Sequence, residues 1–205
     1  SVASAIGLRK EKVIVNVPLI GGGFGRRQAA DYAIEAAQVS KAINAPVQVL
    51  WTRDDDLQHD FYQSMSIQYF KFPLDKLSIP AAARTATGSN VPIGPWRSVE
   101  EFANAYGVQS FIDEMAVALK RDPLDLRLEL YANQPGALGV IKLATEKAGW
   151  GQPLLAGEGR GLAYHATFGV THVAMVAEVA VASDGQVRVK RMVCAVDCGQ
   201  AVNPD

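Results

Sequence analysis

The chain has few sulfur and imidazole ligands: its 205 residues include only two cysteines and three histidines. Two cysteines cannot supply the four ligands of an iron–sulfur cluster, so the chain cannot hold such a cluster alone. Cys194 and Cys198 stand four positions apart along an expected strand. This spacing places them on one face but too far apart for an easy disulfide, so we expect two small buried side chains.

The sequence also lacks an excess of either charge, with 20 basic and 21 acidic residues. Proteins that bind nucleic acid usually carry a basic excess that displaces the counterions of phosphate, so no nucleic-acid partner is expected. The most apolar segments, 13–20 and 172–181, are too short to cross a membrane, and residues 1–12 lack a signal-peptide pattern. We expect a soluble protein, with a cytoplasmic or periplasmic location left open.

The first fifty residues predict a strand, a glycine loop, a helix and a second strand. Val13, Val15 and Val17 share one face of an extended segment that runs to residue 20. After the glycines of residues 21–25, alanine and isoleucine recur at helical spacing over residues 28–43, and Asn-Ala-Pro at 44–46 ends that helix. Residues 47–51 predict the second strand, and residues 52–56 an acidic turn.

The rest of the chain predicts helices followed by strands. Residues 65–72 alternate as in a strand, whereas residues 73–95 carry four prolines and no period. Ser98 and Glu101 have the spacing of a capping box for a helix ending near residue 120. We expect further helices at 123–130 and 137–148, and strands at 161–168, 172–182 and 187–196 with a turn at Asp184-Gly185.

Partial segregation of helices and strands indicates an α+β fold with mixed sheets and packed helices. We expect a glycine-loop lobe over residues 1–72, a connection over 73–93 and a second lobe over 94–205. The second lobe would begin with helices and end with a β-hairpin.

The glycine loop, residues 21–27 with the sequence GGGFGRR, is the most informative segment. Glycine has no Cβ atom, so the backbone N–H groups of such a loop can approach a ligand closely and surround an anion. The positive end of the following helix and the charges of Arg26 and Arg27 would strengthen that attraction. The alternative is a tight strand-to-helix turn without a ligand, although such a turn does not require three consecutive glycines.

A dinucleotide-binding unit has the same order of strand, loop, helix and strand. Its G-x-G-x-x-G pattern fails here, because Arg26 or Gln28 stands where the third glycine belongs. Asp54 follows the second strand but lies well beyond the usual distance for the acid that binds ribose. This interpretation is therefore the weaker one.

Three blocks of the sequence resemble the molybdopterin-binding subunit of the molybdenum hydroxylases, in the branch of isoquinoline 1-oxidoreductase and bacterial aldehyde dehydrogenases. The first is GGGFGRR with the later VQVLWTRDDDLQHDFY, and the second is residues 94–131, beginning GPWRSVEEFANAYG. The third is residues 159–205, from GRGLAYHATFG to VCAVDCGQAVNPD. The resemblance implies the fold of the molybdopterin-binding domains of the xanthine oxidase family.

The resemblance also implies an activity, a cofactor and partners. Such subunits bind molybdenum–molybdopterin cytosine dinucleotide, and they hydroxylate an N-heterocycle or oxidise an aldehyde with water as the oxygen source. Electrons leave through [2Fe–2S] clusters on an iron–sulfur small subunit. By this resemblance two short segments would contact the cofactor, with the Phe24-Gly25 step and Arg97 bordering the metal: Gly22, Gly23, Phe24, Gly25 and Arg26, then Trp96, Arg97 and Ser98. Residues 197–203 would form a turn near the pterin. No residue is expected to be a metal ligand.

The sequence departs from the family pattern in three places. The general base of the family, a glutamate in a Gly-x-Gly-Glu segment, has no counterpart in this chain, and Glu158 only imitates it. The interval between Tyr62 and Gly94 is shorter than in the family. Glu100-Glu101 replace a Gly-His pair, although Asn104 is retained. We therefore expect a truncated or shortened part of a molybdenum hydroxylase, with no catalytic residue of its own. The competing hypothesis is a non-catalytic remnant that keeps the fold without cofactor.

Two smaller groups of residues are also candidate sites. His59 lies near the acids at 54–56, but a solvated turn explains this cluster better than a metal site. His165 and His172 flank a Phe-Gly step and could meet across a turn, near what the resemblance identifies as the border of the substrate channel.

Overall fold

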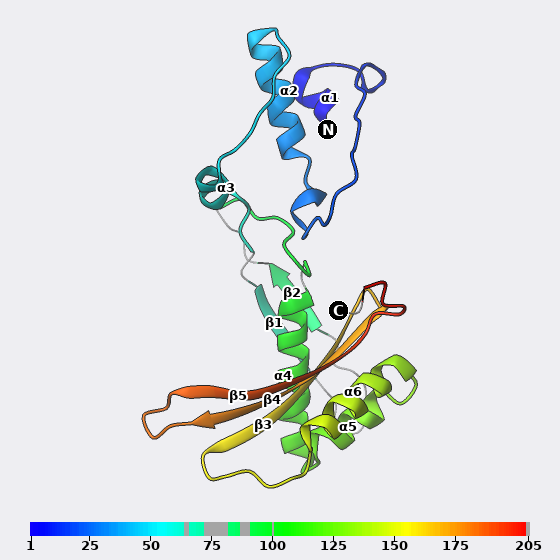
Figure 1. Ribbon diagram of the computed structural model, residues 1–205, viewed down its shortest axis with the longest axis vertical. Coiled ribbons are helices and arrows are strands. Elements are labelled where there is room, and N and C mark those ends of the chain that lie inside the picture. The colour runs from blue at the N-terminus through cyan, green and yellow to red at the C-terminus, as the bar shows by residue number, and fades with distance from the viewer. Residues whose placement is uncertain (64–65, 72–81, 87–90, 100, 204–205) are drawn as a thin grey trace. The chain divides into compact units, whose positions relative to one another are not determined.

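The computed structural model describes residues 1–63, 66–71, 82–86, 91–99 and 101–203 (Figure 1). The protein has an α+β fold, as the sequence predicts. It divides into two compact units, each made of two stretches of chain. The first unit contains Ser1–Ile67 and Thr85–Glu100, and the second contains Gln68–Arg84 and Glu101–Asp205.

Helices dominate the first unit. Helix α1 (Val2–Ile6) packs against α2 (Asp31–Ile43), and the Nζ atom of Lys41 in α2 donates a hydrogen bond of 2.8 Å to the carbonyl oxygen of Ile6. Short 3-10 turns cover Lys10–Lys12 and Arg26–Gln28. The helix predicted over residues 28–43 is confirmed, but α2 begins three residues later, because Gln28 ends the 3-10 turn and Ala29 is extended.

The strands predicted at residues 13–20 and 47–51 are wrong. Both segments lie outside any strand, and their apolar side chains are exposed, with Ile14 at 85%, Leu19 at 104% and Leu50 at 84% of full exposure. The apolar spacing is that of a strand. A strand, however, requires a neighbouring strand for its hydrogen bonds, and the described part of the chain supplies none to either segment.

The predicted acidic turn at residues 52–56 is also wrong, because these residues open helix α3 (Arg53–His59). Thr52 caps this helix: its hydroxyl accepts a hydrogen bond from the amide of Asp55, and the Asp55 carboxylate accepts one from the amide of Thr52. The three aspartates of the first turn also favour the positive end of the helix. Because of this capping box, the acidic residues 54–56 form the first turn of a helix.

A two-stranded sheet pairs β1 (Ser66–Phe70) with β2 (Ala82–Ala86). The strand predicted at 65–72 is confirmed over β1, while Met65 and Phe72 lie outside the described residues. Strand β2 was not predicted, because Ala-Ala-Arg-Thr-Ala has only one β-branched residue and no aromatic residue, whereas such residues are typical of strands. A parallel bridge joins Tyr62 to Ile93.

The second unit contains three helices and a three-stranded antiparallel sheet in the order β3-β4-β5. Each predicted element is confirmed: helices α4 (Glu101–Leu119), α5 (Pro123–Leu130) and α6 (Pro135–Ala148), and strands β3 (Glu158–Thr167), β4 (Thr171–Val181) and β5 (Val187–Asp197). The predicted turn between β4 and β5 is confirmed by a positive φ of 84° at Gly185.

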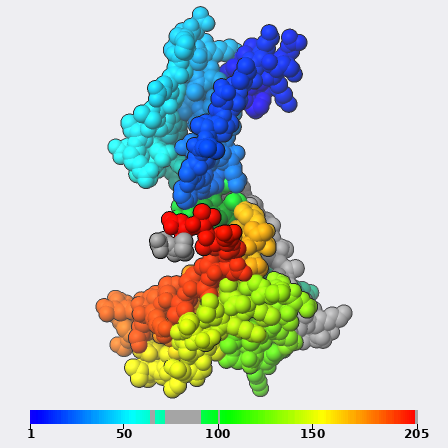
Figure 2. Space-filling view, turned by 45° about the vertical axis from the view of Figure 1, so that its right-hand side comes forward, coloured from blue at the N-terminus to red at the C-terminus, as the bar shows by residue number. Residues whose placement is uncertain are grey.

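One face of this sheet packs against helix α6, so that strands and helices form two layers. Leu162 and Tyr164 of β3 and Val176 of β4 are almost fully buried against Ile141 and Ala144 of α6. Figure 2 shows the green helices packed against the yellow and orange strands of this unit. The alternating burial along β3 and β4 leaves the opposite face of the sheet more open.

The two cysteines are exposed. Cys194 and Cys198 are both free thiols and both exposed, so the prediction of two buried side chains is wrong. Within β5 the neighbouring Ala195 is the residue that faces the core. Because successive side chains of a strand point to opposite faces, Cys194 must point away from α6.

Helix α4 begins differently from the prediction. The hydroxyl of Ser98 donates to the carbonyl oxygen of Arg97, and Ser98 and Val99 have positive φ angles of 62° and 52°, so no capping box forms from Ser98. Gly107 of α4 is required for packing. A Cβ atom there would lie 1.8 Å from Oε1 of Gln68 in β1.

Candidate functional site

The glycine loop is an exposed turn with an unusual backbone. Phe24 and Gly25 have positive φ angles of 48° and 81°, and Gly22 has a φ of 150°. The amides of Arg27 and Gln28 donate to the carbonyls of Gly23 and Gly25, which closes the 3-10 turn. Within the described residues, the amides of Gly22 to Gly25 donate no hydrogen bond. The loop therefore presents several backbone donors that the protein leaves available.

A second short segment of the first unit touches this loop. A Cβ atom on Gly25 would lie 2.5 Å from the carbonyl oxygen of Trp96 and 2.9 Å from the carbonyl carbon of Pro95. The indole of Trp96 is 61% exposed, and the amide of Val99 donates to the Trp96 carbonyl oxygen over 2.6 Å. The structure thus brings together the two segments that the sequence singled out, although they are far apart in the chain.

Arg26 connects the glycine loop to three side chains, those of Asp31, Asp60 and Phe61. Its guanidinium donates two hydrogen bonds of 2.8 Å to the carboxylate of Asp31 at the start of α2, and its Nε lies 2.5 Å from the carboxylate of Asp60. The same guanidinium stacks 5.0 Å from the ring of Phe61, which in turn contacts Gly94. The hydrogen bond with Asp31 raises the pKa of Arg26 and lowers the pKa of the Asp31 carboxyl.

Because two carboxylates neutralise Arg26, this side chain has little positive charge left for a ligand. Arg27 differs: its guanidinium stacks on the ring of Tyr32 at 5.1 Å and forms no ion pair among the described residues. Arg97 is likewise exposed and has no ion pair in the described part of the chain. The available cations beside the glycine loop and the Trp96 segment are therefore Arg27 and Arg97.

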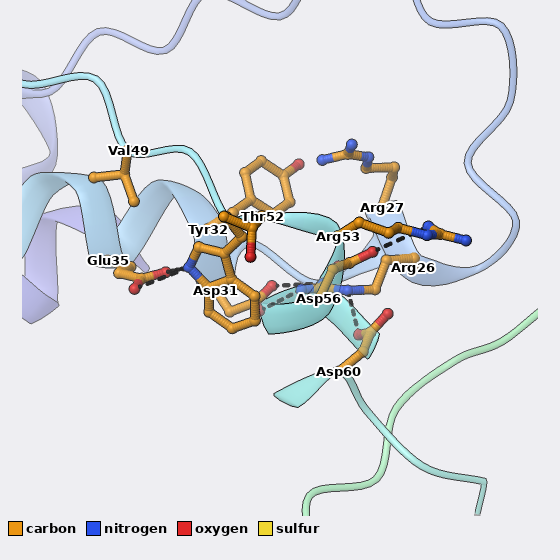
Figure 3. Close-up of a pocket in the computed structure, with 11 residues that line it drawn as sticks. Arg26, Arg27, Asp31, Tyr32, Glu35, Val49, Thr52, Arg53, Asp56 and Asp60 are labelled. Atoms are coloured by element: carbon orange, nitrogen blue, oxygen red, sulfur yellow. Dashed lines mark hydrogen bonds and ion pairs between the residues drawn. The ribbon is translucent and has the colours of Figure 1, made fainter. Parts of the chain in front are cut away.

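A cavity of about 420 Å³ lies beside Arg26, between α2 and α3 (Figure 3). Its walls carry four acids and three arginines, so the cavity has no positive excess. The Nε1 atom of Trp51 donates to the Glu35 carboxylate at 3.0 Å, and Arg53 lies 3.6 Å from Asp56. The lining residues are Arg26, Arg27, Asp31, Tyr32, Glu35, Val49, Trp51, Thr52, Arg53, Asp56 and Asp60.

The histidines do not form the groups considered from the sequence. His165 and His172 stand at different register positions, opposite Val173 and Ala166, and therefore point to opposite faces of the sheet. The Nε2 atom of His165 lies 2.7 Å from the Glu101 carboxylate, and the Nδ1 atom of His172 lies 2.7 Å from the Tyr164 hydroxyl. The expectation that they meet across the turn is wrong.

Among the described residues, no group of three or more histidine, cysteine, aspartate or glutamate side chains could hold a metal ion. His59 ends helix α3, and its Nδ1 atom lies 3.0 Å from the Asp55 carbonyl oxygen. Glu158, which imitates a catalytic base in the sequence, opens β3 and forms an ion pair with Lys190. That hydrogen bond lowers the pKa of the Glu158 carboxyl, so Glu158 would be a poor proton acceptor near neutral pH.

Glu101, which departs from the family pattern, and Asn104, which retains it, also have structural partners. The carboxylate of Glu101 is directed to His165, and Glu100 lies outside the described residues. The Asn104 amide oxygen accepts a hydrogen bond of 3.1 Å from Gln68. Both contacts lie within the second unit, and they give these side chains a role in packing α4.

Comparison with known proteins relates this geometry to one class of domain. Residues 1–85 match the family model described as "Molybdopterin cofactor-binding domain". This match includes the glycine loop and confirms the resemblance predicted from the sequence. It does not favour the competing hypothesis, a fold kept without cofactor. Among the described residues, no helix combines the length and the hydropathy needed to cross a membrane.

Three curated relatives extend the similarity over the second unit. The chain is 29% identical to the beta subunit of isoquinoline 1-oxidoreductase from Brevundimonas diminuta, in an alignment that covers 99% of the chain and 32% of the relative. It is 29% identical to a protein of Gluconacetobacter polyoxogenes named membrane-bound aldehyde dehydrogenase [pyrroloquinoline-quinone], with coverages of 100% and 36%. It is 27% identical to a nicotinate dehydrogenase subunit from Pseudomonas putida, with coverages of 90% and 21%. The chain therefore spans about a third or less of each relative.

Proposed function

We propose that the glycine loop and residues 94–98 bind a molybdenum–pterin cofactor, as part of a molybdenum-dependent oxidoreductase. The observation that carries the proposal is the direct contact between Gly25 and Trp96, which joins the two segments in one unit. The match of residues 1–85 to the molybdopterin cofactor-binding domain supports it.

The residues at this position fit an anionic cofactor. The amides of Gly22 to Gly25 are unused donors in an exposed turn, and backbone donors can hold an anion without changing their own charge. We assign the charge contribution to Arg27 and Arg97, and a positioning role to Arg26, because Asp31 and Asp60 neutralise Arg26. When bound, the cofactor supplies the redox chemistry, and the chain supplies binding and orientation.

We propose the cytosine dinucleotide form of the cofactor, as the resemblance implies. The test is to express the chain in a bacterium that makes this form, purify it and hydrolyse it in acid. The proposal predicts that a fluorescent pterin and cytidine monophosphate are released in equal amounts. Pterin without cytidine monophosphate would exclude the dinucleotide form, and absence of both would exclude cofactor binding by this chain.

The substrate class and the partner are further parts of this proposal. The names of the relatives specify isoquinoline, an aldehyde and nicotinate, and two of the relatives are named as subunits. We therefore propose hydroxylation of an N-heterocycle or oxidation of an aldehyde, with water as the oxygen source. We also propose electron transfer to a small iron–sulfur subunit, since two cysteines cannot ligate a cluster.

A variant of the full-length parent subunit tests the role given to Arg97. Arg97→Ala should lower hydroxylation with isoquinoline as substrate by at least about tenfold, because a lost interaction with a charged group costs about 1.5–3 kcal/mol. The matched control is Arg9→Ala, an exposed arginine of the first unit outside both loops. An unchanged rate for Arg97→Ala at equal cofactor content would contradict a role at the metal site.

A further inference from the structure

Phe61, which follows helix α3, contacts both loops of the candidate cofactor site. The Arg26 guanidinium of the glycine loop stacks on the Phe61 ring, with 5.0 Å between the guanidinium carbon and the ring centroid. In the second loop, a Cβ atom on Gly94 would lie 2.8 Å from Cγ of Phe61. The half-buried ring therefore contacts a side chain of one loop and the backbone of the other.

The two neighbours of Phe61 hold it in this position. Asp60 accepts a hydrogen bond of 2.7 Å from the Phe61 amide and forms the ion pair with Arg26 that Figure 3 shows. Tyr62 forms a parallel bridge with Ile93, closed by two backbone hydrogen bonds of 2.9 and 3.2 Å. One neighbour is thus tied to the glycine loop and the other to the second loop, so the ring has little freedom to move.

The glycine at position 94 is explained by the Phe61 ring. Gly94 has no positive φ angle, so its backbone conformation is open to other residues. A Cβ atom there would lie 2.8, 2.9 and 3.0 Å from Cγ, Cβ and Cδ2 of Phe61. Close approach of the backbone to the ring, and not backbone conformation, therefore requires a glycine at this position.

The two loops consequently meet at two places. Gly25 contacts the carbonyl group of Trp96 directly, whereas Arg26 is linked to Gly94 by the Phe61 ring. A single contact would allow one loop to rotate about it, and a second contact at a different position restrains that rotation. The Phe61 ring supplies this second contact.

We propose that Phe61 is a positioning residue of the candidate cofactor site and sets the orientation of the glycine loop relative to residues 94–98. The inference rests on the proposed function, because the cofactor is the ligand that both loops would hold. Phe61 acts through Arg26 and Gly94, not through a contact of its own with the cofactor. Loops that are already held in the binding orientation lose less conformational entropy on binding, so they retain a ligand better.

Tryptophan signals test this positioning in the absence of cofactor. The full chain has three tryptophans, and labelling with ¹⁵N-tryptophan gives an indole N–H signal for each. Phe61→Leu keeps an apolar side chain but removes the face of the ring, so the signal of Trp96 should move. The signal of Trp150, whose indole donates to Asp122 in the second unit, should stay in place. Phe61→Tyr keeps the ring and should leave the Trp96 signal at its original position.

The rate of cofactor loss tests the same role in the loaded chain. Each protein is purified from a bacterium that makes the cofactor, and the pterin retained on the protein is measured over time. Phe61→Leu should lose pterin about three- to tenfold faster than the unchanged chain, and Phe61→Tyr at the unchanged rate. The matched control is Phe102→Leu, which removes a 50% exposed ring of α4 and should also leave the rate unchanged.

An unmoved Trp96 signal in folded Phe61→Leu would overturn the proposal, and so would an unchanged rate of pterin loss. A Phe61→Tyr variant that behaves like Phe61→Leu would also contradict it. If Phe61→Leu does not fold, Gly94→Ala disturbs the same contact from the second loop and should move the Trp96 signal. An unchanged chain without pterin would contradict the proposed function instead, and the Trp96 signal would still decide whether Phe61 orients the loops.

Discussion

A Cβ atom on Gly25 would lie 2.5 Å from the carbonyl oxygen of Trp96, so only glycine permits the two loops to approach as they do. The φ angle of 81° at Gly25 adds a second reason, because side-chain-bearing residues rarely adopt it. Together these features make Gly25 the contact on which the candidate cofactor site depends.

Gly25→Ala should therefore destabilise the first unit by about 2–4 kcal/mol, because a backbone clash and a left-handed conformation act together. Gly21→Ala is the matched control: no atom lies within 4 Å of its Cβ position, and its φ is not positive. Thermal unfolding of both variants measures the difference. Equal midpoints would mean that the two loops do not pack as described.

Because of the ion pair between Arg26 and Asp31, the free energy of unfolding should decrease as the pH is lowered. Asp31 has a pKa lowered from the ordinary 3.8, so its contribution is complete above that pH and is lost as the pH falls through the lower, folded-state pKa. Because both side chains are partly exposed, the effect should be about 0.5–1 kcal/mol.

Urea unfolding of Asp31→Asn and the unchanged chain checks this prediction at pH 7 and near pH 3. The difference in the free energy of unfolding between the two proteins should be smaller at the lower pH. Asp56→Asn is the control, since Asp56 lies 3.6 Å from an arginine that is 80% exposed, and its loss should change little at either pH. A difference for Asp31→Asn that grows on acidification would contradict the assignment.

Alanine substitutions at two glycines of helix α6 should change the stability of the protein in opposite directions. A Cβ atom on Gly136 would lie 2.6 Å from the imidazole of His172, whereas nothing lies within 4 Å of the corresponding position on Gly139. Gly136→Ala should cost about 1–3 kcal/mol of stability through overpacking, and Gly139→Ala should gain about 0.5–1 kcal/mol of helix propensity. Urea unfolding measures both, and stabilisation by Gly136→Ala would show that His172 does not pack on α6.

Buried Arg127 should be the most sensitive charged residue of the second unit. Its Nε donates to Oε1 of Gln109 at 2.9 Å, and its Nη1 to Asp113 at 2.7 Å. Arg127→Leu leaves these acceptors unpaired and should cost about 2–5 kcal/mol. Arg121→Leu, which removes a partly exposed pair with Glu129, should cost less than about 1 kcal/mol in the same denaturation experiment. Similar losses for both variants would contradict the buried network.

Sequence patterns predicted the second unit well because its elements are stabilised by their neighbours in the chain. Asp122 caps α5 with a local hydrogen bond to the amide of Leu124, and β3, β4 and β5 are joined by short turns. Such local interactions can be recognised from the sequence, because helix caps and short turns require particular residue types at fixed positions.

The first unit was harder to predict from the sequence. The spacing of its apolar residues is that of extended segments, but this spacing does not show whether a neighbouring strand is present. Val17 and Leu50 fit a strand pattern, yet neither lies in a strand. The glycine loop could be predicted from its residues, whereas Trp96 and Arg97 could be predicted only through resemblance. No sequence pattern shows that the charge of Arg26 is neutralised and that of Arg27 is not. Their roles differ because Asp31 and Asp60 reach Arg26 alone, and that pairing depends on the positions of α2 and α3.

Molybdenum content tests the central claim most directly. The chain, Gly25→Ala and Gly21→Ala are purified from a bacterium that makes the cofactor, and molybdenum per protein is measured by inductively coupled plasma mass spectrometry. We predict a ratio near one for the unchanged chain and for Gly21→Ala, and near zero for Gly25→Ala. A ratio near zero for the unchanged chain would contradict the cofactor site, and so would equal occupancy in all three.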